Sequence, residues 1–313
     1  MLSRTADNLY WLARYVERAE YLARILEVTQ RLTTLPLAYV GTSNEWESAV
    51  ATAGCAHAFA AAYPEANEEA VTDFLCFSTA NPSSIRSCFE IARTNARAVR
   101  TALTVEMWDA INGTWLELKR FGNGPTSREE FMRFLRWVQE SSLRFDGSAY
   151  RTMLRNDAYW FSRLGVYMER ADNTARILDV KYHILLPSVA DVGGALDYYQ
   201  WTALLRSVSS FETYRTLYRD QILPIKVAEL LILERRMPRS LAACLEQITI
   251  ALGRIRGQQD APAKRLASEL NARLTHAHIE EIFQDGLHEY LEKCLEDFAA
   301  LGVRIQRSYL GAA

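Results

Sequence analysis

Two stretches of the sequence, YVERAEYLARIL at residues 15–26 and YMERADNTARIL at residues 167–178, are nearly identical. Each carries a Glu-Arg pair at its third and fourth positions, and each ends in Ala-Arg-Ile-Leu. Apolar residues recur in both at three- and four-residue intervals, which predicts a helix in each place. Because the two stretches lie half a chain apart, we infer that one helical unit has been duplicated.

A second pair of segments supports the duplication. NPSSIRSCFE at residues 81–90 aligns with MPRSLAACLE at residues 237–246, and Trp46 aligns with Trp201. The spacing between aligned residues drifts only from about 152 to 156 along the chain. Two long copies do not make a solenoid, which needs several short repeats. We therefore predict two repeats, at residues 1–148 and 149–313, packed about a pseudo-twofold axis in a single domain spanning 1–313.

The predicted fold class is all-α, a single helical bundle. Gly (14) and Pro (8) are few and fall mainly between periodic segments, and strand-like alternation is nearly absent. Pro82 suits a first helical residue, Ser127 and Glu130 form a capping box, and Asp146-Gly147 predicts a turn. The twelve predicted helices are 4–32, 44–63, 67–78, 82–101, 104–121, 128–145, 152–185, 196–219, 224–236, 238–257, 262–276 and 279–309.

Composition limits the classes of function. The net charge is −2, so no global basic field favours nucleic acid. The five cysteines are scattered without metal-ligand spacing, which is typical of core residues in a reducing compartment. No uncharged apolar run approaches 18 residues, and the first twenty residues lack the apolar core of a signal peptide. We expect a soluble cytoplasmic protein that binds neither nucleic acid nor membrane.

The doubled Glu-Arg helix, the NPSS segment, Glu106-Met107-Trp108 and the GLHEYL stretch at 286–291 resemble the bacterial alpha-E family over essentially the whole chain. That family is an all-helical domain of unknown function. The resemblance implies that the chain is encoded beside, or fused to, a circularly permuted ATP-grasp ligase. It implies, more weakly, a transglutaminase-like peptidase or a proteasome-like hydrolase in the same system. Such partners make, modify or degrade a peptide or amide.

Adjacent helix residues point about 100° apart, so Glu17 and Arg18 lie on different faces. Arg18 shares a largely apolar face with Leu22 and Ile25, whereas the face of Glu17 is polar and aromatic. The same contrast holds for Arg170 and Glu169. The pattern therefore predicts buried arginines, flanked by glutamates on the more polar side.

A buried arginine needs a partner, and three are open. The first is cross-pairing of Arg18 with Glu169 and of Arg170 with Glu17, a structural clamp. The second is a carboxylate or carbonyl elsewhere in the bundle. The third is an anionic ligand such as an amino acid or peptide end, held between the two helices. The ligand-binding candidates are Glu17, Arg18, Arg24, Glu169, Arg170 and Arg176, with Tyr10, Arg14 and Tyr21 as secondary candidates on the face of Glu17.

Residues 276–293 hold three of the five histidines. On one continuous helix His278, Glu281, Asp285 and His288 would share a face, a set that could ligate a metal or form a solvated surface. The segment has no HExxH signature, and we predict no metal and no cofactor. His288 and Glu289 stay secondary candidates because they fall within GLHEYL.

No nucleophile, base and oxyanion hole can be assembled from the sequence. The leading interpretation is an accessory or binding component of an ATP-grasp-associated system that makes or modifies a peptide or amide. One alternative is an enzyme acting on a small amino-acid or peptide substrate, with the duplicated glutamates as acid and base. The other is a purely structural subunit whose Glu-Arg pairs lock its two halves together.

Overall fold

The structure is a computed structural model that describes residues 1–33, 44–122, 124–125, 127–183, 195–256 and 262–311. These residues contain fifteen α-helices and no strand, which confirms the all-α class. No helix in the described ranges is both long and apolar enough to cross a membrane. The helices of the first half are α1 Ser3–Leu32, α2 Glu45–Thr52, α3 Ala56–Ala62, α4 Glu68–Thr72, α5 Ile85–Ala98, α6 Val105–Leu118 and α7 Arg128–Thr152. Those of the second half are α8 Asp157–His183, α9 Ala195–Ser207, α10 Phe211–Tyr218, α11 Pro224–Ile232, α12 Leu241–Arg254, α13 Pro262–Thr275, α14 Ile279–Asp285 and α15 Leu287–Ile305.

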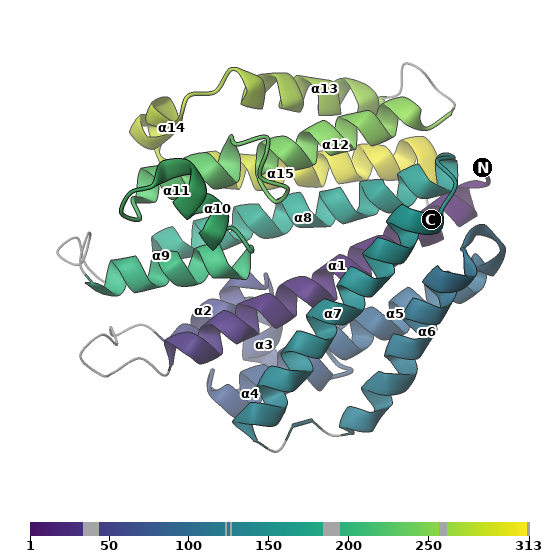
Figure 1. Ribbon diagram of the computed structural model, residues 1–313, viewed down its shortest axis with the longest axis horizontal. Helices are drawn as coiled ribbons and strands as arrows, with labels where there is room; N and C mark the ends of the chain where they lie inside the picture. The colour runs from purple at the N-terminus through teal and green to yellow at the C-terminus, as the bar shows by residue number, and fades with distance from the viewer. Residues whose placement is uncertain (34–43, 123, 126, 184–194, 257–261, 312–313) are drawn as a thin grey trace.

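The two Glu-Arg helices, α1 and α8, pack against each other at the centre of the molecule (Figure 1). Gly165 of α8 permits this close approach. A Cβ atom placed on Gly165 would lie 2.2 Å from the carbonyl oxygen of Tyr10 in α1. The backbones of the two helices therefore nearly touch at Gly165, and only glycine fits there.

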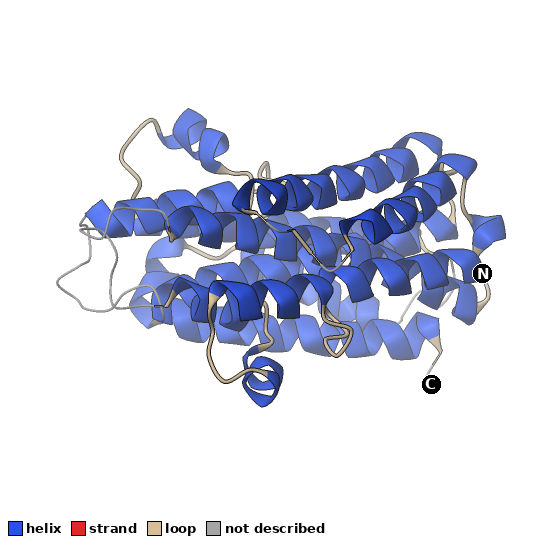
Figure 2. Ribbon diagram, turned by 90° about the horizontal axis from the view of Figure 1, so that it is seen from below, coloured by secondary structure: helices blue, strands red, loops and turns tan. Residues whose placement is uncertain are grey.

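The remaining long helices form a group on each side of the central pair. In the first half α5 and α7 pack on α1, and α6 packs on both. In the second half α12 and α15 pack on α8, and α13 packs on both. Figure 1 shows α12, α13 and α15 running along the long axis of the molecule and α6 and α7 crossing it obliquely, and Figure 2 shows the same helices from below. The packing order is the same in both halves, while the duplication and its axis stay predictions.

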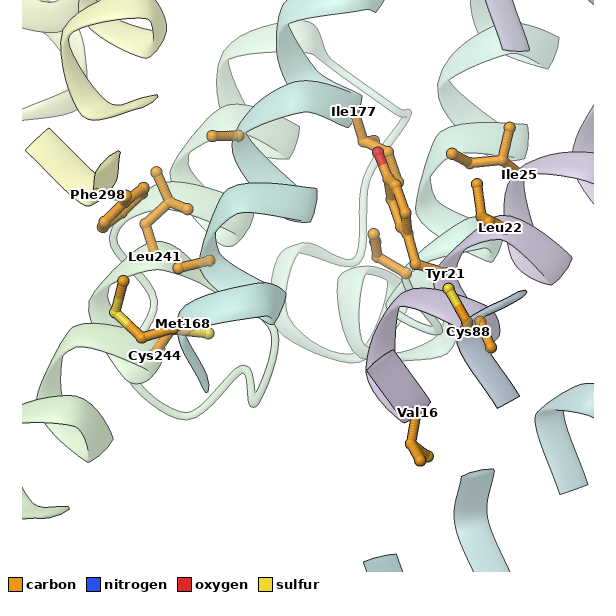
Figure 3. Close-up of a cluster of buried hydrophobic side chains, with 14 of the residues drawn as sticks. Val16, Tyr21, Leu22, Ile25, Cys88, Met168, Ile177, Leu241, Cys244 and Phe298 are labelled. Atoms are coloured by element: carbon orange, nitrogen blue, oxygen red, sulfur yellow. The ribbon is translucent and has the colours of Figure 1, made fainter. Parts of the chain in front are cut away.

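One continuous hydrophobic core joins the two groups. Figure 3 shows Tyr21, Leu22 and Ile25 of α1 next to Ile177 of α8, all of them buried. On the other side of α8, Met168 lies towards Phe298 of α15 (Figure 3). The polar cluster described below lies within this core, where charges must be paired to be tolerated.

Matching serines begin helices α5 and α12. The hydroxyl of Ser84 accepts a hydrogen bond from the Ser87 amide at 3.2 Å. The hydroxyl of Ser240 accepts one from the Ala243 amide at 3.0 Å and donates to the Glu234 carbonyl at 2.7 Å. Both hydroxyls are therefore N-caps of their helices.

Replacing the Ser240 cap gives a first test of these contacts. Ser240→Ala is expected to lower the free energy of unfolding by about 1–2 kcal/mol, because the hydroxyl is fully buried and both of its partners lose a hydrogen bond. Urea unfolding followed by circular dichroism measures the change. Ser240→Thr keeps a hydroxyl and is the control; equal losses in both variants would contradict the capping role.

Three predicted helices are divided in the structure. The one at 44–63 breaks at Gly54 (φ +68°), the one at 196–219 at Ser209 (φ +55°), and the one at 279–309 at Gly286 (φ +106°). At each break one residue has a positive φ, which is incompatible with a right-handed helix and lets the chain change direction. The glycines at 54 and 286 could have indicated such a break in the sequence, but Ser209 could not.

Two local predictions were wrong. Asp146-Gly147 does not form a turn, because α7 continues through it to Thr152. Phe145 and Ala149 on either side are buried, so packing along one face outweighs the low helix propensity of glycine. Pro82 is not the first helical residue, since Ser84 is the N-cap and α5 begins at Ile85.

Candidate functional site

The two Glu-Arg pairs contact each other reciprocally across the α1–α8 interface. Arg18 donates from Nε to Glu169 Oε1 at 2.5 Å and from Nη2 to Oε2 at 3.1 Å. Arg170 donates from Nε to Glu17 Oε1 at 2.8 Å and from Nη2 to Oε2 at 2.9 Å. Both are bidentate pairs, the strongest geometry available to a carboxylate and a guanidinium. This direct contact is the arrangement that the clamp alternative requires.

Each motif carboxylate also receives a second arginine. Arg14 Nε donates to Glu169 Oε2 at 2.6 Å, and Arg239 Nη1 donates to Glu17 Oε1 at 2.9 Å. Arg239 lies directly before α12, where the Thr174 hydroxyl donates to its carbonyl at 2.8 Å. Arg239 was not among the predicted site residues, although its place beside the aligned serines of the two Pro-x-Ser segments was a usable signal.

Glu20 extends the Glu17 side of the cluster and was also missed. Its carboxylate accepts hydrogen bonds from Arg239 at 2.6 Å, from Arg24 Nε at 2.8 Å and from the Ser142 hydroxyl of α7 at 2.7 Å. Buried Glu20 therefore ties α1 to α7 and to the start of α12. We call the following residues the Glu-Arg cluster: Arg14, Glu17, Arg18, Glu20, Arg24, Glu169, Arg170 and Arg239.

Arg18 and Arg170 are largely buried, as predicted, but the glutamates are buried more deeply than the arginines, which is the reverse of the predicted order. The side chains of Glu17 and Glu169 are 4% and 3% exposed, whereas those of Arg18 and Arg170 are 22% and 12% exposed. A short carboxylate can accept hydrogen bonds from several directions, so it takes the centre. The longer arginines reach inward over Tyr15 and Tyr167, with each guanidinium carbon 5.4 Å from the ring centroid.

The arginines keep both buried glutamates ionised. Burial raises the pKa of Glu17, but Arg170 and Arg239 lower it by more, to about 2. Burial likewise raises the pKa of Glu169, and Arg18 and Arg14 lower it to about 2. Neither carboxyl group therefore carries a proton at neutral pH.

These lowered pKa values predict acid sensitivity. In the unfolded chain both carboxyl groups titrate near their ordinary value of 4.5, so folding favours their ionised forms. Their contribution to stability is complete above pH 4.5 and is lost as the pH falls from there towards 2. We expect the free energy of unfolding to drop across this window in urea titrations at fixed pH. Glu169→Gln should flatten the drop, and an unchanged slope in that variant would contradict the assignment.

Arg24 and Arg176 reach away from the reciprocal pairs. Arg24 Nη1 donates to the Ser209 hydroxyl at 2.6 Å, in the turn between α9 and α10. Arg176 pairs with Asp172 at 2.8 Å and lies against Gly54, in the turn between α2 and α3. The six primary candidates therefore do not converge on one point, and their ligand-binding role stays a prediction.

The secondary candidates lie in different places. The buried Tyr10 hydroxyl accepts from Arg14 Nη1 at 3.2 Å, so Tyr10 and Arg14 adjoin the Glu-Arg cluster. Tyr21 donates to the Thr52 carbonyl at 3.1 Å. His288 lies 2.6 Å from Asp179 of α8, and exposed Glu289 folds back towards Gly286 at the start of α15. His288 and Glu289 are therefore remote from the reciprocal pairs along the chain and in their contacts.

The histidine segment does not form a single ligand-bearing face. His278 precedes α14, and the break at Gly286 separates it from His288 on α15. In the described part of the chain no group of three or more His, Cys, Asp or Glu side chains is placed to hold a metal ion.

Two matching cysteines lie next to the cluster. Cys88 and Cys244 are fully buried near Arg18 and Arg170 respectively, and Figure 3 shows Cys88 beside α1 and Cys244 beside α8. Burial raises the pKa of each thiol to about 12. Both are therefore protonated at neutral pH and lack the thiolate that nucleophilic catalysis requires.

Comparison with known proteins identifies the family. Residues 1–310 match Alpha-E, described as a predicted alpha-helical domain with a conserved ER motif. Uncharacterized proteins of Mycobacterium bovis and Mycobacterium tuberculosis are each 24% identical over 319 residues, covering 93% of this chain and 35% of the relative. The chain thus spans about a third of the length of these curated relatives. No solved structure matches. The match over nearly the whole length places this chain in the Alpha-E family.

Proposed function

We propose that the chain is an accessory component of a system that makes or modifies a peptide or amide, and that its partner is a circularly permuted ATP-grasp ligase. The observation that carries the accessory role is the reciprocal Glu-Arg contact. The residues that give the family its motif satisfy one another, so their first task is to hold α1 to α8. A rigid helical body of this kind presents surfaces to another protein.

The lengths of the relatives support a role alongside another protein. In the mycobacterial proteins the matched region is about a third of the chain, so an Alpha-E segment is joined there to a longer polypeptide. The resemblance to the alpha-E family supplies the nature of the partner, an ATP-grasp ligase. A transglutaminase-like peptidase or a proteasome-like hydrolase is a weaker proposal for the same system.

We further propose that residues 1–148 and 149–313 are two copies of one unit related by a pseudo-twofold axis. Matching contacts at aligned positions support this arrangement. Tyr63 bonds through its hydroxyl to Asp73, and Tyr218 bonds to Glu229 in the same way, about 155 residues later. A second match lies in the turns, where Arg24 reaches Ser209 and Arg176 reaches Gly54.

The enzyme alternative has less support. Paired glutamates act as acid and base when their surroundings separate their pKa values. Here arginines lower the pKa of both Glu17 and Glu169 to about 2, so neither could serve as a general acid at neutral pH. A wholly structural role is the remaining alternative, and it would leave the chain without a ligase partner.

Affinity purification of the tagged chain from its own cells tests the proposal. We expect an ATP-grasp ligase to co-purify, and we expect ATP-dependent ligation by that ligase to increase when the chain is added back. A tagged, unrelated helical protein is the control for non-specific capture. Recovery of the chain alone, together with a ligase whose activity is unaffected by it, would contradict the accessory role.

A further inference from the structure

A cavity of about 290 Å³ lies beside the Glu-Arg cluster, between α1, α8 and the C-terminal helix α15. Its walls are mostly apolar, and the charged residues among them are Arg14 and Asp172. This volume suits one amino-acid-sized group and is at the lower end of the range for small-molecule sites. Its apolar lining includes Trp11, Met168, Phe298 and Gly302.

Arg14 gives the cavity a positive charge. It donates from Nε to Glu169 and from Nη1 to Tyr10, while Nη2 donates to no other described residue. Glu169 is shared between Arg14 and Arg18, so two guanidinium groups face one carboxylate. Asp172 is balanced by Arg176. The charged groups beside the cavity therefore carry one excess positive charge, and Arg14 Nη2 has no hydrogen-bond partner among the described residues.

The residues at the aligned positions of the other half make contacts with one another. Under the proposed repeat, Trp11 aligns with Arg163, and Gly302 aligns with Asp146. Arg163 forms a salt bridge with Asp146 and donates to the Tyr167 hydroxyl at 3.1 Å.

A second set of aligned positions differs between the two halves in the same way. Asp172 aligns with Glu20, and Phe298 aligns with Ser142. The Ser142 hydroxyl donates to Glu20 at 2.7 Å, whereas apolar Phe298 lines the cavity with Asp172. At these aligned positions one half thus has a salt bridge and a hydrogen-bonded carboxylate, whereas the other half has a cavity with an aromatic lining.

We propose that this cavity binds the carboxylate of an apolar amino acid, either free or as the C-terminal residue of a peptide. The free nitrogen of Arg14 would receive the carboxylate, because a guanidinium is suited to that planar anion. Trp11, Met168 and Phe298 would cover the apolar side chain, and Gly302 leaves room for it. The inference rests on the proposed accessory role and names the class of ligand that the component holds.

Isothermal titration calorimetry on the isolated full chain tests the site with three probes. N-acetyl-L-phenylalanine represents a peptide end, L-phenylalanine represents the free amino acid, and N-acetyl-L-phenylalaninamide lacks the carboxylate. We expect the acetylated acid to bind at least about tenfold more tightly than its amide, the ratio that 1.4 kcal/mol of carboxylate recognition gives. Tighter binding of L-phenylalanine than of the acetylated acid would identify the free amino acid as the source, with Asp172 receiving the amine.

Two substitutions locate the binding. Gly302→Leu fills the cavity without changing charge, since a Cβ at Gly302 meets only Met168, at 3.8 Å. Gly253→Leu is the matched control, because Gly253 lies in exposed helix with nothing within 4 Å of its Cβ position. We expect Gly302→Leu to weaken binding of the acids at least about tenfold and Gly253→Leu to leave it unchanged. Arg14→Met should remove the preference for the acid over the amide.

Absence of binding by both acids, equal binding of acid and amide, or full binding by Gly302→Leu would each overturn the proposal. These failures are separable from failure of the accessory role. If a ligase co-purifies with the chain and no acid binds, the accessory role stands and the cavity is not a carboxylate site. If an acid binds and no ligase is captured, the site stands and the partner is wrong.

Discussion

Glu169→Gln is expected to lower the free energy of unfolding by about 3–5 kcal/mol, the range found when one partner of a buried ion pair is removed. Glu169 is the only carboxylate hydrogen-bonded to Arg14 and Arg18 among the described residues, and its side chain is 3% exposed. The glutamine keeps the size of the side chain but leaves two mostly buried guanidinium groups facing a neutral amide. Their mutual repulsion and their desolvation then oppose folding.

Chemical denaturation in urea at pH 7 measures the effect. Glu296→Gln is the matched control, because its ion pair with Lys293 is solvent-exposed and contributes little. We expect no measurable change in that variant. A Glu169→Gln protein as stable as the control would mean that Arg14 and Arg18 have other counterions, and it would argue against the clamp.

Gly165→Ala is expected to destabilise the chain by about 3 kcal/mol or more, at the upper end of the cost of overpacking a core. The added methyl carbon would lie 2.2 Å from the Tyr10 carbonyl oxygen and 3.2 Å from the Ala13 side chain. A backbone carbonyl cannot rotate away as a side chain can. Helices α1 and α8 must therefore separate, and the reciprocal Glu-Arg pairs one turn further along must lengthen with them.

Gly147→Ala provides the opposite expectation with the same substitution. Gly147 lies inside α7, and its Cβ position has nothing within 4 Å. Alanine favours a helix over glycine, so this variant should be more stable by about 0.5–1 kcal/mol. Thermal unfolding of both variants distinguishes a local propensity effect from a clash. If both substitutions stabilise the chain, the close approach at Gly165 is wrong.

The central helices could be predicted from the sequence because their signals are local. The repeated Glu-Arg stretch gave α1 and α8 to within a few residues at their start, and the cross-paired clamp was among the alternatives. The contacts of Glu20 with Arg239 and Ser142 could not be predicted, because they join segments more than 120 residues apart. Sequence spacing on a single helix says nothing about which distant loop meets it.

The order of burial of the glutamates and arginines was predicted wrongly for a related reason. The apolar neighbours of Arg18 indicated a buried arginine, but periodicity does not show how many donors converge on one carboxylate. Three nitrogen donors from two arginines surround each motif glutamate, which draws the glutamate inward. The break at Ser209 could not be predicted for a different reason. Serine rarely adopts a positive φ, and Ser209 is held here by a tertiary contact with Arg24.

The central claim, that the reciprocal Glu-Arg pairs hold α1 to α8, is tested most directly by a double-mutant cycle on Arg18 and Glu169. Urea unfolding of Arg18→Met, Glu169→Gln, the double variant and the unmodified chain gives the coupling energy. We predict a favourable coupling of about 1.5 kcal/mol or more, as for close charge pairs in buried interfaces. Single-variant effects that add within about 0.5 kcal/mol, or an Arg18→Met chain more stable than the original, would contradict the clamp.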